Sequence, residues 1–346
     1  MSGRYRAAII GCGRIASTIE DELRHLPGIQ PLPYSHAGAY QAARGVELVA
    51  ASDPDNMRLE EFGKRWAISS LFSDTERMLE SVRPDIVSIC VPTRLHAECM
   101  SAVCRAGVRG IVLEKPVAVS LPEADAMVAE AEQSGAIVAM NHLRCYDPFH
   151  ERARALIREG FIGTVHTVFS YWDEGWSFGG SHLFSLLRML LDSRPVRVYC
   201  EGVGDDGPDP GGNALIAYEN GARALIAAPR VGKTPKEVDL LGTEGRIRMG
   251  TYTLQLFRSD TSQGYSVPTE WPFFGRMEMR SPMTLLIEDV VEGLKGEGRV
   301  RCGITEGRDM LEIAVALNES ARTGSTVTLP LEGLPQEALT VETLLG

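Results

Sequence analysis

The sequence predicts an α/β protein of two domains. Residues 1–141 are expected to form a parallel sheet with crossover helices, and residues 142–346 an α+β domain with a large, open, mainly antiparallel sheet. A length of 346 residues suits two domains of roughly 150 residues each. In the first part, nearly continuous hydrophobic runs alternate with helical stretches, which is typical of parallel strands buried on both faces. In the second part apolar and polar residues alternate, which indicates strands with one solvated face.

Five hydrophobic runs predict the strands of the first domain, at 6–11, 46–53, 85–92, 110–116 and 136–141. Helical patterns separate them, at 58–66, 75–82, 96–107 and 121–135. The last two patterns end at Gly107 and Gly135, and glycine commonly ends a helix because it adopts the left-handed conformation without strain.

The second domain is expected to begin with a helix at 148–160, followed by strands in the segments 164–172, 195–203, 213–229, 237–250 and 252–259. The turn pairs Asn220-Gly221 and Glu244-Gly245 predict antiparallel hairpins. Two further helical patterns, at 283–294 and 305–321, complete this domain.

The composition excludes several classes of function. A formal net charge of −11 argues against a nucleic-acid partner, because phosphate binding needs clustered lysine and arginine. No apolar stretch reaches the roughly 18 residues of a membrane span, and the first residues do not resemble a signal peptide. Seven cysteines without a C-x-x-C pair favour unpaired thiols in the cytoplasm. The segment from His96 to Cys99 holds only half of a zinc-deaminase signature, so no metal site is predicted.

A glycine-rich turn follows the first predicted strand, where Gly11, Gly13 and Ala16 match the pattern G-x-G-x-x-G/A. The glycines allow a tight turn and a close approach to a pyrophosphate, whose charge is met by amides at the helix N-terminus. This position, at the first strand–helix junction of an alternating domain, predicts a Rossmann dinucleotide-binding domain. The candidate contacts to the cofactor in this turn are Gly11, Gly13, Arg14 and Ile15.

Asp53, at the end of the second predicted strand, is the candidate ligand of the cofactor ribose. The acidic residue of this fingerprint usually lies about 20 residues after the glycines, whereas Asp53 lies 40 positions after Gly13. We interpret the proline-containing segment 20–36 as an insertion that breaks the first helix. A solvated turn aspartate is the alternative for Asp53. Its carboxylate would repel a 2′-phosphate and no arginine follows before Arg58, so NAD is favoured over NADP.

The triplet Glu114, Lys115 and Pro116 ends the hydrophobic run that begins at Gly110. The carboxyl ends of parallel strands line the ligand crevice in such folds, so this charge pair is expected to face a ligand. Removing a hydride from an alcohol carbon requires a base for the hydroxyl proton, and an ammonium close to a positive nicotinamide ring loses its proton more easily. A surface Glu–Lys pair is the alternative, and such pairs contribute little.

The chain resembles the Gfo/Idh/MocA oxidoreductase family (glucose-fructose oxidoreductase, inositol dehydrogenase and MocA-like proteins) over nearly its whole length. The resemblance lies in the G-x-G turn, in "CVPTRLHAECMSAVCRAGVRGIVLEKP", in "NHLRCYDPFHERARALIREGFIG" and in "LLGTEGRIRM". It implies an NAD(P)-dependent dehydrogenase that acts on a secondary hydroxyl of a sugar, cyclitol or sugar derivative. A homodimer or homotetramer that packs through the open sheet is the expected assembly.

The resemblance also implies roles for residues at the strand ends. Lys115 would be the general base beside the nicotinamide, with Glu114 and His96 close to the cofactor. Asn141 would bind the nicotinamide amide, and Pro92 is a further candidate contact to the cofactor.

The segment "WSFGGSHLFSLLRMLLDSRP" resembles the second catalytic segment of the family, in which an aspartate precedes a histidine by four residues. His182 matches the histidine and, with an ordinary pKa near 6.5, is expected to relay a proton. A helix-capping or core histidine is the alternative. Phe178 occupies the position of the aspartate, and Ser185 stands where a second aspartate is frequent. Asp173 and Glu174 are candidates to replace the missing carboxylate.

Further substrate contacts are predicted where the chain of the family passes from the cofactor domain to the substrate domain. The full set of candidate substrate-binding residues is Arg144, Tyr146, Asp147, Trp172, Asp173 and His182, of which Tyr146 and His182 are also candidate catalytic residues. Packing at the domain interface is the alternative for Arg144, and burial is the alternative for Trp172 and Trp176. Lys233 is a weaker candidate contact.

Two other functions are compatible with the sequence. A redox-neutral NAD-dependent glycosidase or lyase would oxidise its substrate transiently and regenerate NAD. A non-catalytic NAD- or sugar-sensing protein would explain Phe178, although a sensor has no need of both Lys115 and His182.

Overall fold

The computed structural model of the chain describes residues 3–25, 32–202, 209, 211–228, 236–250, 253–260, 267–272 and 278–332. The described residues fall into two compact units. The first contains the described residues of Met1–Tyr146 and Met279–Arg308, and the second those of Asp147–Glu278 and Asp309–Leu344. The sequence predicted one boundary, between residues 141 and 142. It did not predict that the segment Met279–Arg308 returns to the first unit.

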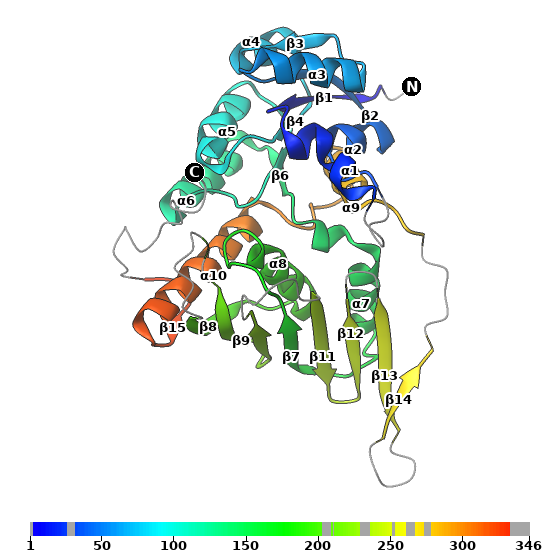
Figure 1. Cartoon of the computed structure of the whole chain (residues 1–346), viewed down its shortest axis with the longest axis vertical. Helices are drawn as coiled ribbons and strands as arrows, with labels where there is room; N and C mark the ends of the chain where they lie inside the picture. Colours follow the sequence, from blue (N-terminus) through cyan, green and yellow to red (C-terminus); the bar gives the residue numbers. More distant parts are fainter. Residues whose placement is uncertain are drawn as a thin grey trace. The chain divides into compact units, whose positions relative to one another are not determined.

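A six-stranded parallel sheet, with the strand order β3-β2-β1-β4-β5-β6, forms the centre of the first unit (Figure 1). Its strands are β1 (Tyr5–Ile10), β2 (Val46–Ser52), β3 (Ser70–Phe72), β4 (Ile86–Ile89), β5 (Gly110–Leu113) and β6 (Ile137–Met140). Five of them confirm the predicted runs, and β4 and β5 are buried along their whole length. The short edge strand β3 was not predicted, because three residues carry too little hydrophobic pattern.

The crossover helices of the first unit are α3 (Asn56–Trp66), α4 (Thr75–Val82), α5 (His96–Arg105) and α6 (Leu121–Ser134). Side chains cap three of their N-termini: Asp55 on α3, Asp74 on α4 and Ser120 on α6 each accept a hydrogen bond from a backbone N–H of the first turn. The short helices η2 (Thr93–Leu95) and η3 (Leu143–Tyr146) follow β4 and β6. Helix α9 (Pro282–Leu294), from the returning segment, packs against α2, β5 and β6.

The first helix is broken, as the prolines predicted. A π-helical turn η1 (Arg14–Thr18) and a short helix α1 (Ile19–Leu23) follow the glycine turn, and the chain becomes helical again in α2 (His36–Ala42). Glu20 connects the two sides of the insertion, because its Oε1 accepts hydrogen bonds from the backbone N–H groups of Tyr34 (3.0 Å) and Ser35 (2.7 Å). The inserted residues 26–31 lie outside the described part of the chain.

The second unit contains a nine-stranded sheet with the order β14-β13-β12-β11-β7-β10-β9-β8-β15. Its strands are β7 (Val165–Tyr171), β8 (Pro195–Gly202), β9 (Gly212–Tyr218), β10 (Arg223–Ala227), β11 (Glu237–Gly242), β12 (Gly245–Met249), β13 (Leu254–Asp260), β14 (Val267–Trp271) and β15 (Val327–Thr328). All neighbours are antiparallel except β7 and β10, which confirms the predicted mainly antiparallel sheet. The predicted hairpins join β9 to β10 and β11 to β12.

One face of this sheet is buried. Inward side chains such as Val168, Leu240 and Ile247 form a continuous core with α7 (Pro148–Arg158), α8 (Gly180–Leu191) and α10 (Ile304–Thr323). On the opposite face, strand positions two residues apart carry exposed side chains, including Phe169 and Tyr171 on β7. The period-two alternation in the sequence therefore corresponds to one covered face and one open face.

Within the described residues, no helix is long and apolar enough to cross a membrane. All seven cysteines lie in this part of the chain, and none forms a disulfide.

Candidate cofactor and catalytic site

The two glycines of the first turn are needed for different reasons. Gly11 has a φ of +88°, and a Cβ built on it would lie 2.8 Å from the carbonyl oxygen of Cys90, so only glycine fits there. Its N–H donates to the Ser52 carbonyl oxygen (2.8 Å), which ties the turn to β2. A Cβ on Gly13 would meet no atom within 4 Å. Gly13 therefore leaves open space over the backbone, which suits the close approach of a pyrophosphate.

Asp53 lies at the carboxyl end of β2 and is 5% exposed. Its Oδ2 accepts a hydrogen bond from the backbone N–H of Cys12 (2.8 Å), and its Oδ1 accepts one from Asp55 (2.9 Å). The carboxylate is therefore bound to the glycine turn, and the alternative of a solvated turn aspartate does not describe it. A carboxylate has about four acceptor sites, so two remain for ribose hydroxyls.

A cavity of about 450 Å³ lies next to the glycine turn, with Cys12, Gly13 and Arg14 on one side and residues of α3 on the other. Arg14 and Pro92 are exposed, and Ile15 is half-buried. The exposed residues offer surface for a cofactor, and their contacts to it stay predictions.

Glu114, directly after β5, is the centre of a buried polar network. Its Oε1 accepts hydrogen bonds from His36 Nε2 (2.8 Å) and from the Asn141 amide. The second nitrogen of His36 lies 2.9 Å from the Ser88 hydroxyl, which also bonds Tyr40. Burial acts to raise the pKa of Glu114, but the hydrogen bonds from His36 and Asn141 and the Lys115 charge outweigh it and keep this pKa below its ordinary value.

His36 was missed by the sequence analysis. It is fully buried on α2 and lies 78 positions before Glu114 in the chain. The only signal available was a histidine in the predicted insertion, next to Ser35, which caps α2 by accepting a bond from Gly38.

Three side chains, those of Lys115, Asn141 and His142, lie close to Glu114. Lys115 is half-buried, and Asn141 is 3% exposed. Within the described residues, Asn141 Oδ1 is a buried acceptor without a hydrogen-bond partner. His142, which was not singled out from the sequence, is buried next in the chain. Burial and the positive charge of Lys115 lower the pKa of His142 to about 3, so its imidazole is neutral.

His96 opens α5 and has no exposed surface. Its ring nitrogens lie 3.2 Å from the Val117 carbonyl oxygen and 3.1 Å from the Val91 carbonyl oxygen. Burial lowers the pKa of His96, although both neighbouring carbonyls favour a protonated ring. His96 therefore connects the loop after β4 to the loop that contains Lys115 and the cis peptide bond to Pro116. A direct contact to the cofactor stays a prediction.

Tyr146 is fully buried in the first unit, and its hydroxyl donates to Asp289 Oδ2 on α9 (3.0 Å). The Arg301 guanidinium lies 5.4 Å from the centre of its ring. Burial and the Asp289 charge raise the pKa of Tyr146 well above its ordinary value. These contacts anchor the returning segment and leave no free face for a substrate, so the predicted substrate and catalytic roles of Tyr146 have no geometric support. Arg144, two residues earlier, is half-buried.

Several candidates in the second unit have structural contacts. Asp147 caps α7 by accepting a hydrogen bond from the Phe149 N–H (2.8 Å). Trp172 and Trp176 belong to the core of the unit, at 2% and 0% exposed. The Trp172 indole N–H donates to the Gly179 carbonyl oxygen (3.0 Å). This is the buried arrangement that was the alternative to sugar stacking.

His182 lies in the first turn of α8 and is half-buried. The N-cap of this helix is Gly179, and no side chain caps it, so His182 is not a capping residue. Phe178 is 54% exposed. Ser177 and Phe178 lie in the turn before the helix. Their backbone N–H groups donate hydrogen bonds to the carboxylate of Asp209, both at 2.9 Å. A carboxylate is thus present at this turn, from a residue that the sequence analysis did not single out.

The two acidic residues proposed to replace the missing aspartate differ in their contacts. Glu174 forms an ion pair with Lys236, whose ammonium lies 5.4 Å from the centre of the Trp172 ring. Asp173 is half-buried. Lys233, the weaker candidate contact, lies outside the described residues.

The candidate base and the candidate relay belong to different units: Lys115 lies in the first unit and His182 in the second.

The residues at the carboxyl edge of the parallel sheet fit a nicotinamide dinucleotide. Gly13 leaves the backbone accessible, Asp53 retains acceptor sites, and Asn141 Oδ1 is an acceptor for the N–H group of a carboxamide. In the described part of the chain, no group of three or more histidine, cysteine, aspartate or glutamate side chains is arranged to bind a metal ion.

Two family models match the chain. One, described as "Oxidoreductase family, NAD-binding Rossmann fold", matches residues 5–142. The other, described as "GFO/IDH/MocA C-terminal domain", matches residues 150–248.

Several known proteins are similar to this chain over nearly its whole length. The chain is 26% identical to D-apiose dehydrogenase of Paraburkholderia graminis, with 94% of this chain and 90% of the relative covered. It is 23% identical to scyllo-inositol 2-dehydrogenase (NAD(+)) of Bacillus subtilis, with 96% and 98% covered. A solved structure of a putative NADPH-dependent oxidoreductase from Desulfitobacterium hafniense has a TM-score of 0.79 at 18% identity, with 95% and 98% covered. That likeness shows a shared fold.

Proposed function

Because the chain belongs to the Gfo/Idh/MocA family of NAD-binding oxidoreductases, we propose that it oxidises a secondary hydroxyl of a sugar, cyclitol or sugar derivative. In this proposal Lys115 is the general base and His182 is the proton relay. The observation that carries it is the position of Lys115 at the carboxyl edge of the parallel sheet, next to buried Glu114 and to Asn141, whose Oδ1 is available to a carboxamide.

Bound NAD supplies the acceptor for the hydride that leaves the carbinol carbon. Lys115 Nζ takes the proton of the hydroxyl, so that the carbon–oxygen double bond forms as the hydride departs. Glu114, through the backbone N–H of Lys115 (3.3 Å), helps to fix the segment. Lys115 must be a neutral amine to accept this proton, and a positive nicotinamide ring beside it would favour loss of the ammonium proton.

The second unit contributes His182. In this proposal its imidazole acts as the relay that carries the proton to solvent. Asp209 supports this segment, because its carboxylate binds the backbone of the turn that precedes α8. A carboxylate at position 178 is therefore not required to order the turn. We also propose a cytoplasmic setting, because seven cysteines without a C-x-x-C pair favour unpaired thiols.

The test is the formation of NADH from NAD with a panel of sugars, inositols and sugar acids. We expect Lys115→Ala to lower kcat by about 10²- to 10⁴-fold, the usual contribution of a general base, while calorimetry still detects NAD binding. Lys64→Ala is the matched control, since Lys64 is an exposed lysine on α3. Full activity of Lys115→Ala would overturn the mechanism. Turnover without net NADH would favour the redox-neutral glycosidase or lyase, and NAD binding without any turnover would favour the sensor.

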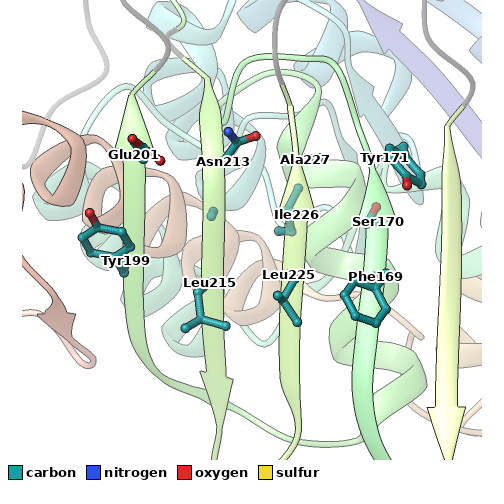
Figure 2. A pocket seen from close by; sticks show the side chains of 11 residues that line it. Phe169, Ser170, Tyr171, Tyr199, Glu201, Asn213, Leu215, Leu225, Ile226 and Ala227 are labelled. Atoms are coloured by element: carbon teal, nitrogen blue, oxygen red, sulfur yellow. The ribbon is translucent and has the colours of Figure 1, made fainter.

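We also propose that the open face of the second-unit sheet packs against a second copy of the chain. Figure 2 shows Phe169, Tyr171, Tyr199, Leu215 and Leu225 projecting from neighbouring strands on this face. Their exposed fractions lie between 39% and 58%. A contiguous apolar patch of this kind usually marks an interaction surface, and a two-fold axis lets one patch cover itself.

The molar mass in solution tests the assembly. We expect light scattering to give a multiple of the 37.7 kDa chain mass, and Leu215→Asp combined with Leu225→Asp to give monomer. Met57→Asp is the matched control, because Met57 is an exposed apolar residue on α3, outside the patch. A wild-type protein that is monomeric at all concentrations would contradict this part of the proposal.

A further inference from the structure

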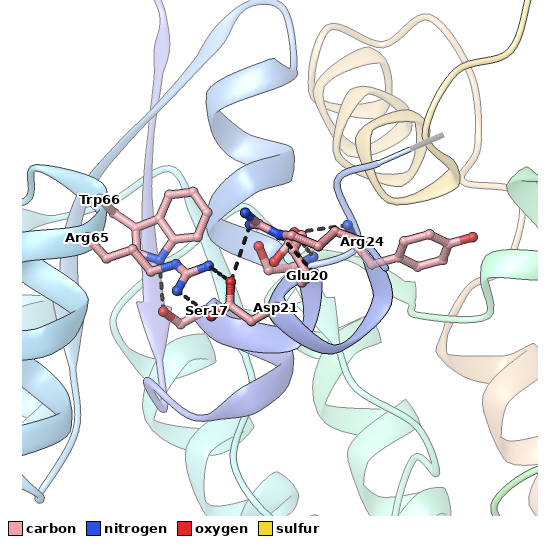
Figure 3. Close-up of polar contacts among 8 residues, drawn as sticks. Ser17, Glu20, Asp21, Arg24, Arg65 and Trp66 are labelled. Atoms are coloured by element: carbon pink, nitrogen blue, oxygen red, sulfur yellow. Dashed lines mark hydrogen bonds and ion pairs between the residues drawn. The ribbon is translucent and has the colours of Figure 1, made fainter. Parts of the chain in front are cut away.

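The short helix α1, which belongs to the insertion after the glycine turn, has acidic side chains that bind arginines of the neighbouring cavity. Asp21 forms two hydrogen bonds with the Arg65 guanidinium, at 2.7 and 2.8 Å (Figure 3). Glu22 binds Arg14 in the same bidentate way, at 2.6 and 2.7 Å. Bidentate pairs are the most specific form of arginine–carboxylate contact.

Both arginines line the cavity of about 450 Å³ beside Gly13, and Arg58 is a third. Arg58 lies on α3, a few residues after Asp53, and its side chain is 3.5 Å from the Asp55 carboxylate. The cavity therefore adjoins the glycine turn and α3, the helix that follows Asp53 in the chain. The adenosine ribose of a dinucleotide binds near the glycine turn and the acidic residue at the end of β2.

Three guanidinium groups at this place would normally favour a 2′-phosphate, because arginine binds phosphate through the same two-pronged contact that it makes with a carboxylate. Here carboxylates hold two of the three guanidinium groups, those of Arg14 and Arg65, by bidentate hydrogen bonds, and the Asp55 carboxylate lies 3.5 Å from the third. A 2′-phosphate would compete with these carboxylates for the guanidinium groups and would bring its own negative charge close to them.

A hydrogen bond between uncharged side chains also joins α3 to η1, close to the ion pair of Asp21 and Arg65. The Trp66 indole N–H, at the end of α3, donates to the Ser17 hydroxyl on η1 (2.9 Å). Asp21 also contacts Arg24 (3.2 Å), as Figure 3 shows. Arg65 is therefore positioned against α1 by more than its own ion pair, which reduces the entropy that the pair must overcome.

We propose that Asp21 and Glu22 set the cofactor preference of this protein for NAD over NADP by holding the guanidinium groups of Arg65 and Arg14. The inference rests on dinucleotide binding at the glycine turn, which is part of the proposed function. It assigns the preference to the inserted helix α1 in addition to Asp53.

Calorimetric titration of the full chain with NAD⁺ and NADP⁺ tests the inference without any turnover. The variants are Asp21→Asn, Glu22→Gln and the two combined. Each single change is expected to tighten NADP⁺ binding about fivefold and the double change about twentyfold, on the scale of exposed ion pairs, while the affinity for NAD⁺ stays within about twofold. Glu60→Gln is the matched control, because it removes the same charge from an exposed site on α3 that pairs with Lys64.

A second set of variants separates this role from a structural one. Adding Arg14→Gln and Arg65→Gln to the double variant should abolish the gain in NADP⁺ affinity, because the released guanidinium groups are then absent. The inference is overturned if the double variant binds NAD⁺ but keeps the wild-type ratio of NADP⁺ to NAD⁺ affinity, or if the wild type binds NADP⁺ as tightly as NAD⁺. A wild type that binds neither nucleotide would overturn the proposed function, and this inference with it.

Discussion

The Lys115 segment of the first unit and the His182 segment of the second unit are fixed by different kinds of contact. Buried side chains fix the first, where Glu114 accepts bonds from His36 and Asn141. Contacts to the backbone fix the second: the Trp172 indole binds the Gly179 carbonyl, and Asp209 binds two N–H groups. The difference teaches that the first segment depends on a buried charge, so we expect it to be more sensitive to the loss of one contact than the second.

The largest effect on stability is expected from His36→Leu. This change removes a hydrogen bond from the buried Glu114 carboxylate, and the loss of a hydrogen bond to a buried charged group costs about 3 kcal/mol. Urea unfolding gives the free energy of unfolding, and combining the change with Glu114→Gln should recover part of the loss. A loss below about 1 kcal/mol would show that the two segments do not differ as described.

A smaller effect, on activity, is expected from His182→Ala. Loss of the relay should lower kcat by about 100-fold, at the lower end of the range for proton-transfer groups, and leave the stability nearly unchanged because the imidazole is only half-buried. His166→Ala removes an exposed histidine from the same unit and is the control. If His182→Ala unfolds the protein or keeps full kcat, the segment is structural.

The free energy of unfolding should depend on pH through two groups of the first segment, His142 and Glu114. The folded pKa of His142, about 3, lies below its unfolded value near 6.5. Between these values the unfolded state binds one more proton, so stability falls as pH falls, by up to about 1.4 kcal/mol per pH unit. Glu114 acts in the same direction at lower pH, because its folded pKa is depressed and its contribution is lost as pH falls through that pKa.

Unfolding measured from about pH 7 to about pH 5 tests this dependence. The variant His142→Gln should flatten the slope by up to one proton, whereas His166→Gln, at an exposed site, should not. A slope that His142→Gln leaves unaltered would contradict the placement of a neutral, buried imidazole beside Lys115.

The smallest effect is expected from Asp209→Ala, in the second segment. Two backbone N–H groups lose their acceptor, but the Phe178 N–H is exposed and can bind water. The cost should therefore be about 1 kcal/mol in thermal or urea unfolding. A loss as large as that of His36→Leu would remove the difference between the two segments.

The sequence alone determined the parts of the site that depend on local patterns. Continuous hydrophobic runs specified the parallel strands, and the glycine turn and the position of Lys115 followed from where those runs end. Period-two alternation specified the second sheet with its open face. These features depend on residues close together in the chain, where periodicity and turn chemistry act directly.

The tertiary structure decided which distant side chains meet. It placed His36 on Glu114, returned α9 to the first unit, buried Tyr146 against Asp289, and set Asp21 and Glu22 against the arginines beside Gly13. No local pattern encodes such pairings, because a polar side chain finds its partner only after the apolar faces have packed and excluded water from both.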